Sequence, residues 1–126
     1  MLDNLPFRDF DAIIPVPLHK TRSKTRGFNQ SELLAKDISD FYKVPVLRDI
    51  LVRVKKTAPQ FGLKKAQRHK NVEGAFAVNA PYRISGRTIL LIDDIMTTGA
   101  TANECERTLF AAGAKQVMIH TLSKAG

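Results

Sequence analysis

Cysteine is almost absent from this sequence. Its 126 residues include one cysteine, Cys105, and this excludes both a disulfide framework and a zinc site built from cysteines. Long apolar runs are missing as well, because the aliphatic run at residues 89–92 is far too short to cross a bilayer. The chain does not open with a basic segment followed by a long apolar stretch, as a secretory signal would. These absences predict a soluble, cytoplasmic protein with no membrane partner.

Several signatures of nucleotide-binding and catalytic sites are also missing. There is no Gly-x-Gly-x-x-Gly and no Gly-Lys-Ser/Thr sequence, which removes the main support for a Rossmann oxidoreductase or a P-loop nucleotidase. No nucleophile-elbow motif is present, and His19, His69 and His120 lack the spacing of metal ligands. Tryptophan is absent and the tyrosines are Tyr42 and Tyr82, so aromatic platforms for stacking single-stranded bases are poorly represented.

Acidic residues are scarce. Twelve Asp and Glu stand against 20 Lys and Arg, and the formal net charge of +8 predicts an anionic partner. One stretch without any acid lies between Asp11 and Glu32, and another lies between Asp49 and Glu73. Solvated loops rich in lysine would account for either stretch alone, but two of them beside a phosphate motif favour an anion-binding role. Over half of the basic residues lie there, namely Lys20, Arg22, Lys24, Arg26, Arg53, Lys55, Lys56, Lys64, Lys65, Arg68 and Lys70.

The rest of the composition is that of an ordinary globular protein, with 44% hydrophobic and 25% charged residues. Since no repeat or linker divides the chain, the length predicts one domain over residues 1–126. Apolar runs predict strands at residues 11–16, 50–54, 88–93 and 117–122, and a weaker strand at residues 75–78. Helices are predicted from the capping residue Asn29 onward, over residues 64–70, and over residues 101–112.

The order of these elements predicts an α/β fold. The last strand, helix and strand lie within about 35 residues, which is typical of a parallel pair with a right-handed crossover. We therefore expect a parallel sheet flanked by helices, with Gly113 ending the last helix. The apolar face of the first helix is predicted to contain Leu33, Leu34, Ile38 and Phe41, and that of the last helix Ala102, Cys105, Leu109 and Ala112.

A buried strand that ends in two acids and turns into a helix carries the clearest chemical signal. Residues 89–92 precede Asp93 and Asp94, and Thr-Thr-Gly then leads into the helix. The unpaired N–H groups and positive dipole of a helix start bind phosphate, and Gly99 lets the backbone approach closely. Acids would repel a phosphate placed on them, so the pair fits ribose hydroxyls, or a metal, one step along the same ligand. The motif predicts a site for a sugar 5-phosphate.

This motif resembles the signature with which type I phosphoribosyltransferases bind phosphoribosyl diphosphate (PRPP). That signature consists of four apolar residues, two acids and a Thr/Ser-rich turn ending in Gly-x-Thr, and every position is filled here. The resemblance implies a Rossmann-like parallel core and assigns Asp93 and Asp94 to the ribose 2- and 3-hydroxyls. It assigns the 5-phosphate loop to Met96, Thr97, Thr98, Gly99, Ala100 and Thr101.

A second resemblance indicates one particular family among the proteins that carry this PRPP signature. Residues 15–19 (Pro-Val-Pro-Leu-His), Arg22 and residues 26–30 (Arg-Gly-Phe-Asn-Gln) look like the pattern of the ComF family of competence-associated, phosphoribosyltransferase-like proteins. Together with the PRPP signature, the resemblance covers nearly the whole chain from residue 11. The matching positions between these two segments are Arg53, Thr57, Pro59, Gln60, Leu63, Arg68, Asn71, Val72, Gly74, Ala75 and Phe76.

The resemblance gives each basic stretch a role. Residues 18–27 correspond to the loop that holds the diphosphate, and residues 55–71 to a flap that closes over the ligand. Arg22 and Arg26 are favoured for positioned contacts because a guanidinium binds phosphate with two parallel hydrogen bonds; with the acidic pair they are the candidate catalytic residues. The diphosphate candidates are Leu18, His19, Lys20, Arg22 and Arg26, and the flap candidates are Arg53, Thr57, Gln60, Arg68 and Asn71.

The resemblance also implies a reaction. Type I enzymes displace diphosphate from C1 of PRPP with a nitrogen base, using Mg²⁺ held mainly by ligand oxygens and water. We therefore expect a phosphoribosyltransferase, a glycosyltransferase of pentosyl groups, in DNA uptake or nucleotide metabolism. The acceptor is unknown, with a nucleobase as the expected class, and type I enzymes are often homodimers.

A second function stays open at this point. ComF-type proteins commonly carry an N-terminal zinc module and a helical region, and this chain has only about ten residues before its first predicted strand. We expect it to lack the zinc or hood region, as a fragment or a short member would. The alternative is a non-catalytic module that binds PRPP or a nucleotide and acts with a competence helicase or single-stranded DNA. The salt dependence of binding distinguishes PRPP binding from DNA binding, since protein binding to the phosphate backbone of DNA weakens steeply with added salt.

Overall fold

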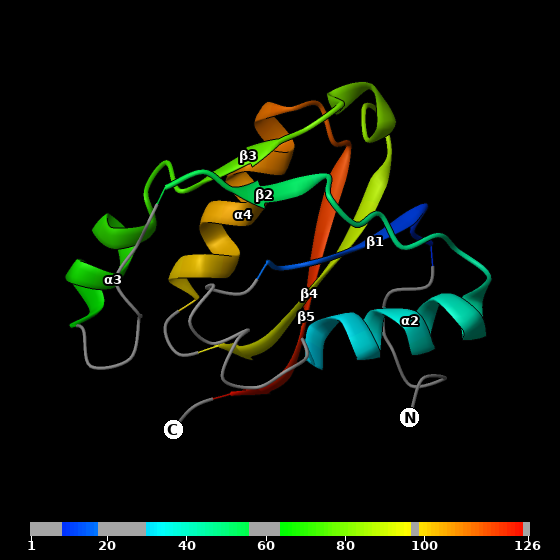
Figure 1. The fold of residues 1–126 in the computed structure, drawn as a ribbon, viewed down its shortest axis with the longest axis horizontal. Helices are drawn as coiled ribbons and strands as arrows, with labels where there is room; N and C mark the ends of the chain where they lie inside the picture. Colours follow the sequence, from blue (N-terminus) through cyan, green and yellow to red (C-terminus); the bar gives the residue numbers. More distant parts are fainter. Residues whose placement is uncertain (1–8, 18–29, 56–63, 97–98, 125–126) are drawn as a thin grey trace.

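The computed structural model describes residues 9–17, 30–55, 64–96 and 99–124. These form an α/β fold in which helices flank a parallel sheet (Figure 1), as the sequence predicts. The elements in chain order are β1 (Ala12–Pro15), α2 (Gln30–Tyr42), β2 (Leu51–Arg53), α3 (Lys65–Val72), β3 (Phe76–Val78), the 3-10 helix η2 (Pro81–Arg83), β4 (Thr88–Met96), α4 (Ala100–Ala111) and β5 (Gln116–Lys124).

The central sheet contains β1, β4 and β5 in that order, and both pairs of neighbours are parallel. Ile13 of β1 lies opposite Leu90 of β4. On the other side of β1, Ile13 N–H donates to the carbonyl of Pro45 at 2.9 Å, and Leu47 N–H donates to the carbonyl of Ile13 at 2.8 Å. This parallel bridge at Val46 places both β1 and β4 in the interior of the sheet. The β2 and β3 strands form a separate antiparallel pair.

Side chains of β4 alternate between two hydrophobic layers. Leu91 is fully buried in a cluster with Cys105 of α4 and Phe76 of β3. Leu90 is fully buried in a second cluster, with Ile38 of α2. Helices α2 and α4 therefore cover opposite faces of the sheet (Figure 1). Burial on both faces explains why β4 has aliphatic side chains at four successive positions.

The two crossover connections leave the sheet in opposite directions. The chain leaves β1, forms α2 and returns beside β1 at Val46, on the side away from β4. It leaves β4, forms α4 and returns as β5, on the side away from β1. Neighbouring parallel strands whose connections diverge in this way form a topological switch point, and the crevice at their carboxyl ends is where open α/β sheets bind ligands. The fold thus singles out the carboxyl ends of β1 and β4.

The predicted apolar face of the first helix is partly wrong. Leu33 and Phe41 are each 53% exposed, whereas Ala35 and Ile38 are fully buried. Positions 33, 37 and 41 are neighbours along one side of a helix. Because the charged Asp37 lies in the middle of this side, the side faces solvent. The capping role predicted for Asn29 lies outside the described residues.

The predicted boundaries hold to within a few residues, and β4 and β5 are longer than predicted. Their pairing continues to Met96 opposite Lys124, because parallel neighbours extend each other beyond their apolar runs. Gly113 follows α4 with φ of +109°, which confirms its predicted place at the helix end. A Cβ atom there would lie 3.3 Å from Ser85 Oγ, a tight contact that adds to the preference for glycine set by the positive φ. None of the described helices has the length and apolar character needed to cross a bilayer.

Candidate functional site

The carboxyl ends of β1 and β4 bring together two segments that are far apart in the sequence. Val16 N–H, just beyond β1, donates to the carbonyl of Ile92 at 2.8 Å. Asp93 is the next residue of β4, and Pro17 is the next residue after Val16. The exit from β1 therefore lies beside the first acid of the predicted ribose site. The predicted diphosphate residues Leu18, His19, Lys20, Arg22 and Arg26 follow that exit but lie outside the described residues.

Asp93 is a buried carboxyl at the end of the hydrophobic part of β4. The residue is 6% exposed and lies opposite Thr121 of β5. The negative charge of Asp93 affects a buried group of the core. Burial raises the pKa of the Cys105 thiol well above its ordinary value, and the charge of Asp93 raises this pKa further. Burying a carboxylate costs folding free energy unless the group has hydrogen-bonding or charged partners. An acid at this buried strand end is therefore more typical of a binding site than of a packing position. Asp94 follows in the same strand.

The turn into α4 supplies the second half of the predicted site. Gly99 adopts the left-handed conformation, with φ of +80°, and α4 begins at the nearly fully buried Ala100. The first N–H groups of a helix have no partner within the helix, and α4 begins four residues after Met96, the last residue of β4. Thr101 lies in the first turn of α4. The predicted loop residues Thr97 and Thr98 lie outside the described residues, and Met96 ends β4.

Arg53 lies at the same end of the molecule. It is the last residue of β2, and its Nε donates to the carbonyl of Pro17 at 3.2 Å. Its guanidinium lies over the ring of Phe76, 4.9 Å from the ring centroid. The sequence analysis groups Arg53 with the flap, and in the structure this residue contacts the exit from β1. Arg68 and Asn71 lie in α3, which contacts α4, while Thr57 and Gln60 lie outside the described residues.

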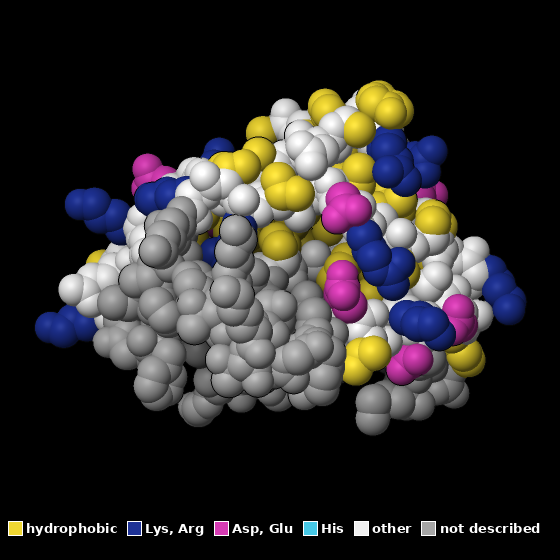
Figure 2. All heavy atoms as spheres, in the orientation of Figure 1, with side chains coloured by type: hydrophobic (Ala, Val, Ile, Leu, Met, Phe, Trp, Pro, Cys, Tyr) yellow, Lys and Arg dark blue, Asp and Glu magenta, His cyan; other side chains and the backbone are white. Residues whose placement is uncertain are grey.

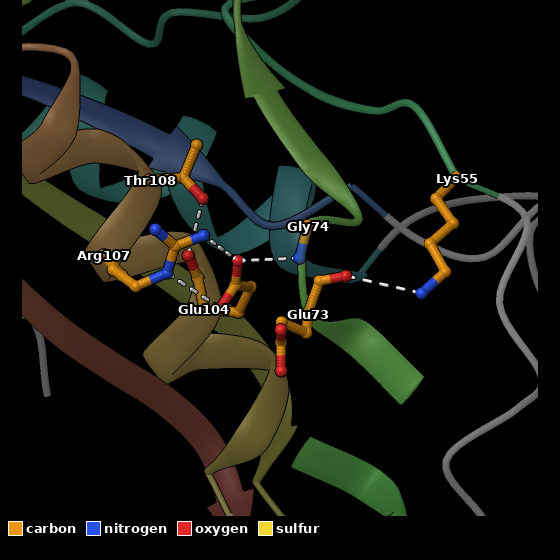
Figure 3. A network of polar contacts seen from close by, with 6 residues as sticks. All are labelled: Lys55, Glu73, Gly74, Glu104, Arg107 and Thr108. Atoms are coloured by element: carbon orange, nitrogen blue, oxygen red, sulfur yellow. Dashed lines mark hydrogen bonds and ion pairs between the residues drawn. The ribbon is translucent and has the colours of Figure 1, made fainter. Parts of the chain in front are cut away.

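A polar network missed by the sequence analysis joins α4 to the segment after α3 (Figure 3). Glu104 is 9% exposed, and its carboxylate accepts a hydrogen bond of 3.0 Å from Gly74 N–H. Arg107 binds the same carboxylate with two groups, Nε at 3.0 Å and Nη2. Lys55 Nζ donates to the carbonyl of Glu73 at 3.4 Å. An acid beside the apolar positions of α4, three residues before an arginine, was the available signal for this pair.

Replacing Glu104 with glutamine is expected to lower the free energy of unfolding by about 1 kcal/mol at pH 7. The Arg107 hydrogen bond is the largest cause that holds the pKa of Glu104 below its ordinary value, and the bond from Gly74 adds to it. A depressed carboxyl pKa contributes stability above the unfolded-state pKa, and this contribution is lost as the pH falls through the folded-state pKa. The difference between wild type and Glu104→Gln should therefore shrink as the pH falls below the ordinary glutamate pKa of about 4.3, and it should be lost once Glu104 is protonated in the folded state.

Urea denaturation across this pH range measures that difference. Glu106→Gln, on the same helix, is the matched control and should leave the stability within about 0.5 kcal/mol of wild type. A Glu104→Gln difference that is independent of pH would contradict the charge-based explanation.

Metal ligands are sparse in the part of the chain that the structure describes. It contains no group of three His, Cys, Asp or Glu residues that could hold a metal ion. Asp93 offers hard carboxylate oxygens, which suit Mg²⁺. The expectation that Mg²⁺ would take its ligands mainly from a bound phosphate compound and water stays a prediction.

Two histidines, His69 and His120, and the cysteine were predicted to have packing or surface roles. Cys105 is fully buried on the apolar side of α4. His120 lies in β5, where burial lowers its pKa. His69 lies exposed on α3. These positions agree with packing or surface roles.

Comparison with known proteins connects this geometry to a family. The profile described as "Phosphoribosyl transferase domain" matches residues 25–126. The chain is similar to Competence protein F of Haemophilus influenzae, with 38% identity over 120 residues, 91% of this chain and 51% of that protein. It is 34% identical over 114 residues to DNA utilization protein YhgH of Escherichia coli K12, covering 90% of this chain and 49% of that protein. Competence protein ComFC of Bacillus subtilis is 32% identical over 102 residues, 81% of this chain and 39% of that protein. The chain thus spans about half the length, or less, of these relatives.

Solved structures agree on the fold. The chain is similar to the glutamine PRPP amidotransferase of B. subtilis complexed with ADP and GMP, with a TM-score of 0.65 and 18% identity over 97% of this chain and 24% of that one. It is also similar to a glutamic acid mutant of a protein named HPRT, with a TM-score of 0.51 and 14% identity over 96% of this chain and 65% of that one. At these identities the likeness is one of fold.

Proposed function

Because the chain belongs to the phosphoribosyl transferase domain family, and within it to the ComF proteins, we propose that it binds PRPP with Mg²⁺ and transfers the phosphoribosyl group to a nitrogen acceptor. The observation that carries the proposal is the switch point between β1 and β4. There a buried Asp93, an adjoining Asp94 and the start of α4 follow one another within eight residues, from 93 to 100. Few ligands other than a sugar 5-phosphate need hydroxyl acceptors and an anion site so close together.

Each part of the site has a role toward PRPP. Asp93 and Asp94 accept hydrogen bonds from the ribose 2- and 3-hydroxyls. The 5-phosphate lies against the start of α4, where backbone N–H groups and threonine hydroxyls donate to it. The residues that would surround this phosphate are Met96, Thr97, Thr98, Gly99, Ala100 and Thr101.

The basic residues after β1 would receive the leaving group. In the transfer, the bond between ribose C1 and the diphosphate oxygen breaks, a bond from C1 to the acceptor nitrogen forms, and the acceptor loses a proton. Arg22 and Arg26 stabilise the negative charge that develops on the diphosphate, with Leu18, His19 and Lys20 in the same loop. Mg²⁺, when bound, neutralises diphosphate charge and orients the ligand oxygens. A nucleobase is the proposed class of acceptor.

The names of the relatives extend the proposal to a biological role. Relatives named for competence and for DNA utilization support a role in competence. We propose further that the protein acts in DNA uptake, in the cytoplasm and together with other competence proteins. A homodimer remains the proposed assembly.

A second candidate function, binding of single-stranded DNA, is favoured by an exposed edge at the amino ends of β4 and β5. Tyr82 of η2 is 79% exposed. Arg83, Arg87 and Lys115 are exposed on the same edge, where Lys115 N–H donates to the carbonyl of Arg87 at 2.8 Å. Among the described residues, no ion pair involves these three cations. Figure 2 shows Lys and Arg side chains beside hydrophobic ones at this corner.

Two features make this edge compatible with a nucleic acid backbone. Residues 74–92 and 107–126 contain no Asp or Glu, so phosphates would meet little repulsion from these segments. An exposed tyrosine beside cations can stack on one base. One aromatic side chain makes a small platform, and PRPP binding is therefore the first proposal.

One calorimetric series tests both functions. Wild-type protein is titrated with PRPP and Mg²⁺, with PRPP and EDTA, and with a single-stranded oligonucleotide, each at low and at high salt. The first proposal expects saturable PRPP binding that requires Mg²⁺. The second expects oligonucleotide binding that weakens steeply with salt and is insensitive to EDTA. If folded protein binds no PRPP in the presence of Mg²⁺, the first proposal is wrong.

A further inference from the structure

Arg53 connects three elements that meet at the switch point. It belongs to β2, its Nε donates to the carbonyl of Pro17 at the exit from β1, and its guanidinium lies on the ring of Phe76 in β3. Phe76 is opposite Arg53 in the strand pair and is 5% exposed. A guanidinium stacked on a buried ring while it donates to a carbonyl has little freedom to move. Arg53 is therefore a fixed group and differs from a solvated surface charge.

Arg53 contacts Pro17, and the N–H of the neighbouring Val16 donates to the carbonyl of Ile92, the residue before Asp93. The buried thiol of Cys105 experiences both charges, since Asp93 raises its pKa and Arg53 lowers it. Coulomb interactions of this kind weaken with distance. Both charges therefore act on one buried thiol of the core.

From these contacts we infer that Arg53 is a positioning residue of the PRPP site, which holds the exit from β1 at a set position relative to Asp93. This inference rests on the proposed function and deepens it. The exit from β1 leads to the diphosphate side of the proposed site, and Asp93 is on its ribose side. PRPP differs from ribose 5-phosphate by its diphosphate, so it gains full affinity only when both sides are held at the correct separation.

The test compares the affinities of PRPP and ribose 5-phosphate, both with Mg²⁺, in wild type, Arg53→Gln and Arg53→Lys. The ratio of the two affinities is expected to fall by about tenfold in both variants. Lysine restores the charge, but it cannot place a planar group on Phe76 and donate to Pro17 at the same time. Phe76→Leu should reproduce part of the loss. Arg107→Gln, which removes another paired arginine, should leave the ratio unchanged and controls for general destabilisation.

A ligand-free measurement separates this inference from the proposed function. Amide hydrogen exchange of Val16, whose N–H donates to Ile92, should accelerate in Arg53→Gln and remain at the wild-type rate in Arg107→Gln. If wild type binds neither ligand, the proposed function fails, and unchanged Val16 exchange would then overturn the role of Arg53 as well. If wild type binds both ligands, an unchanged ratio in Arg53→Gln, or a wild-type ratio in Arg53→Lys, overturns the inference alone.

Discussion

Binding of PRPP with Mg²⁺ is expected to weaken by about 100-fold or more when Asp93 and Asp94 are both replaced with asparagine. A carboxylate accepts hydrogen bonds with both oxygens, whereas an asparagine side chain has one acceptor oxygen and would point an N–H group at a hydroxyl or metal. Each hydrogen bond to a charged group contributes roughly 1.5–3 kcal/mol. Losing both carboxylates therefore exceeds the effect of any single basic residue around the diphosphate.

Isothermal titration of PRPP into wild type and the double variant measures this loss. Asparagine matches aspartate in size, so the buried Asp93 position should still fold, and circular dichroism checks this. Asp40→Asn is the matched control, because Asp40 is an exposed partner of Lys36 on α2, far along the chain from the site. Binding by the folded double variant within threefold of wild type would exclude the acidic pair from the ribose site.

Leu91→Ala is expected to have the largest effect on stability, about 3–4 kcal/mol less free energy of unfolding. Leu91 is fully buried in the middle of β4, in the cluster that α4 and the β2–β3 pair cover. Removing its branched side chain leaves a cavity that the paired strands on either side keep open. The fold of a single domain has roughly 5–15 kcal/mol to lose.

Urea denaturation monitored by circular dichroism measures the effect of Leu91→Ala. Leu33→Ala makes the same chemical change at a residue that is 53% exposed, and it should cost less than about 1 kcal/mol. Equal losses in the two variants would contradict the assignment of Leu91 to the core and Leu33 to the solvent-exposed side of α2.

The stability of β4 bears on function, because this strand contains both the core residue Leu91 and the two acids of the proposed site. Residues 89–92 form the aliphatic, fully buried part of β4, and the two acids Asp93 and Asp94 follow it in the same strand. Neighbouring strands hold β4 along its length, so the acids at its end have a rigid support. A site at the end of a central strand is positioned more firmly than one on a loop.

Features that are local along the chain could be predicted from the amino-acid sequence. Residues 89–101 form an aliphatic run, two acids and a glycine turn into a helix, and each of these depends on side chains a few positions apart. Burial on both faces requires apolar side chains at successive positions, and this run of apolar residues is why the strand β4 could be predicted. Gly99 and Gly113 were recognisable because turns that need positive φ favour glycine.

Contacts between distant segments could not be predicted, because they depend on how the folded chain packs. Arg53 contacts Pro17, 36 positions earlier in the chain, and Glu104 contacts Gly74, 30 positions earlier. The sequence contains no periodic signal for such contacts, because each depends on how the β2–β3 pair and α3 pack on α4. The orientation of α2 was decided in the same way: its sequence offers apolar residues on two sides, and packing on β1 and β4 buries one of them. The divergence of the crossovers at β1 and β4, which makes this end of the sheet a topological switch point, is a property of strand order, and strand order is set by long-range packing.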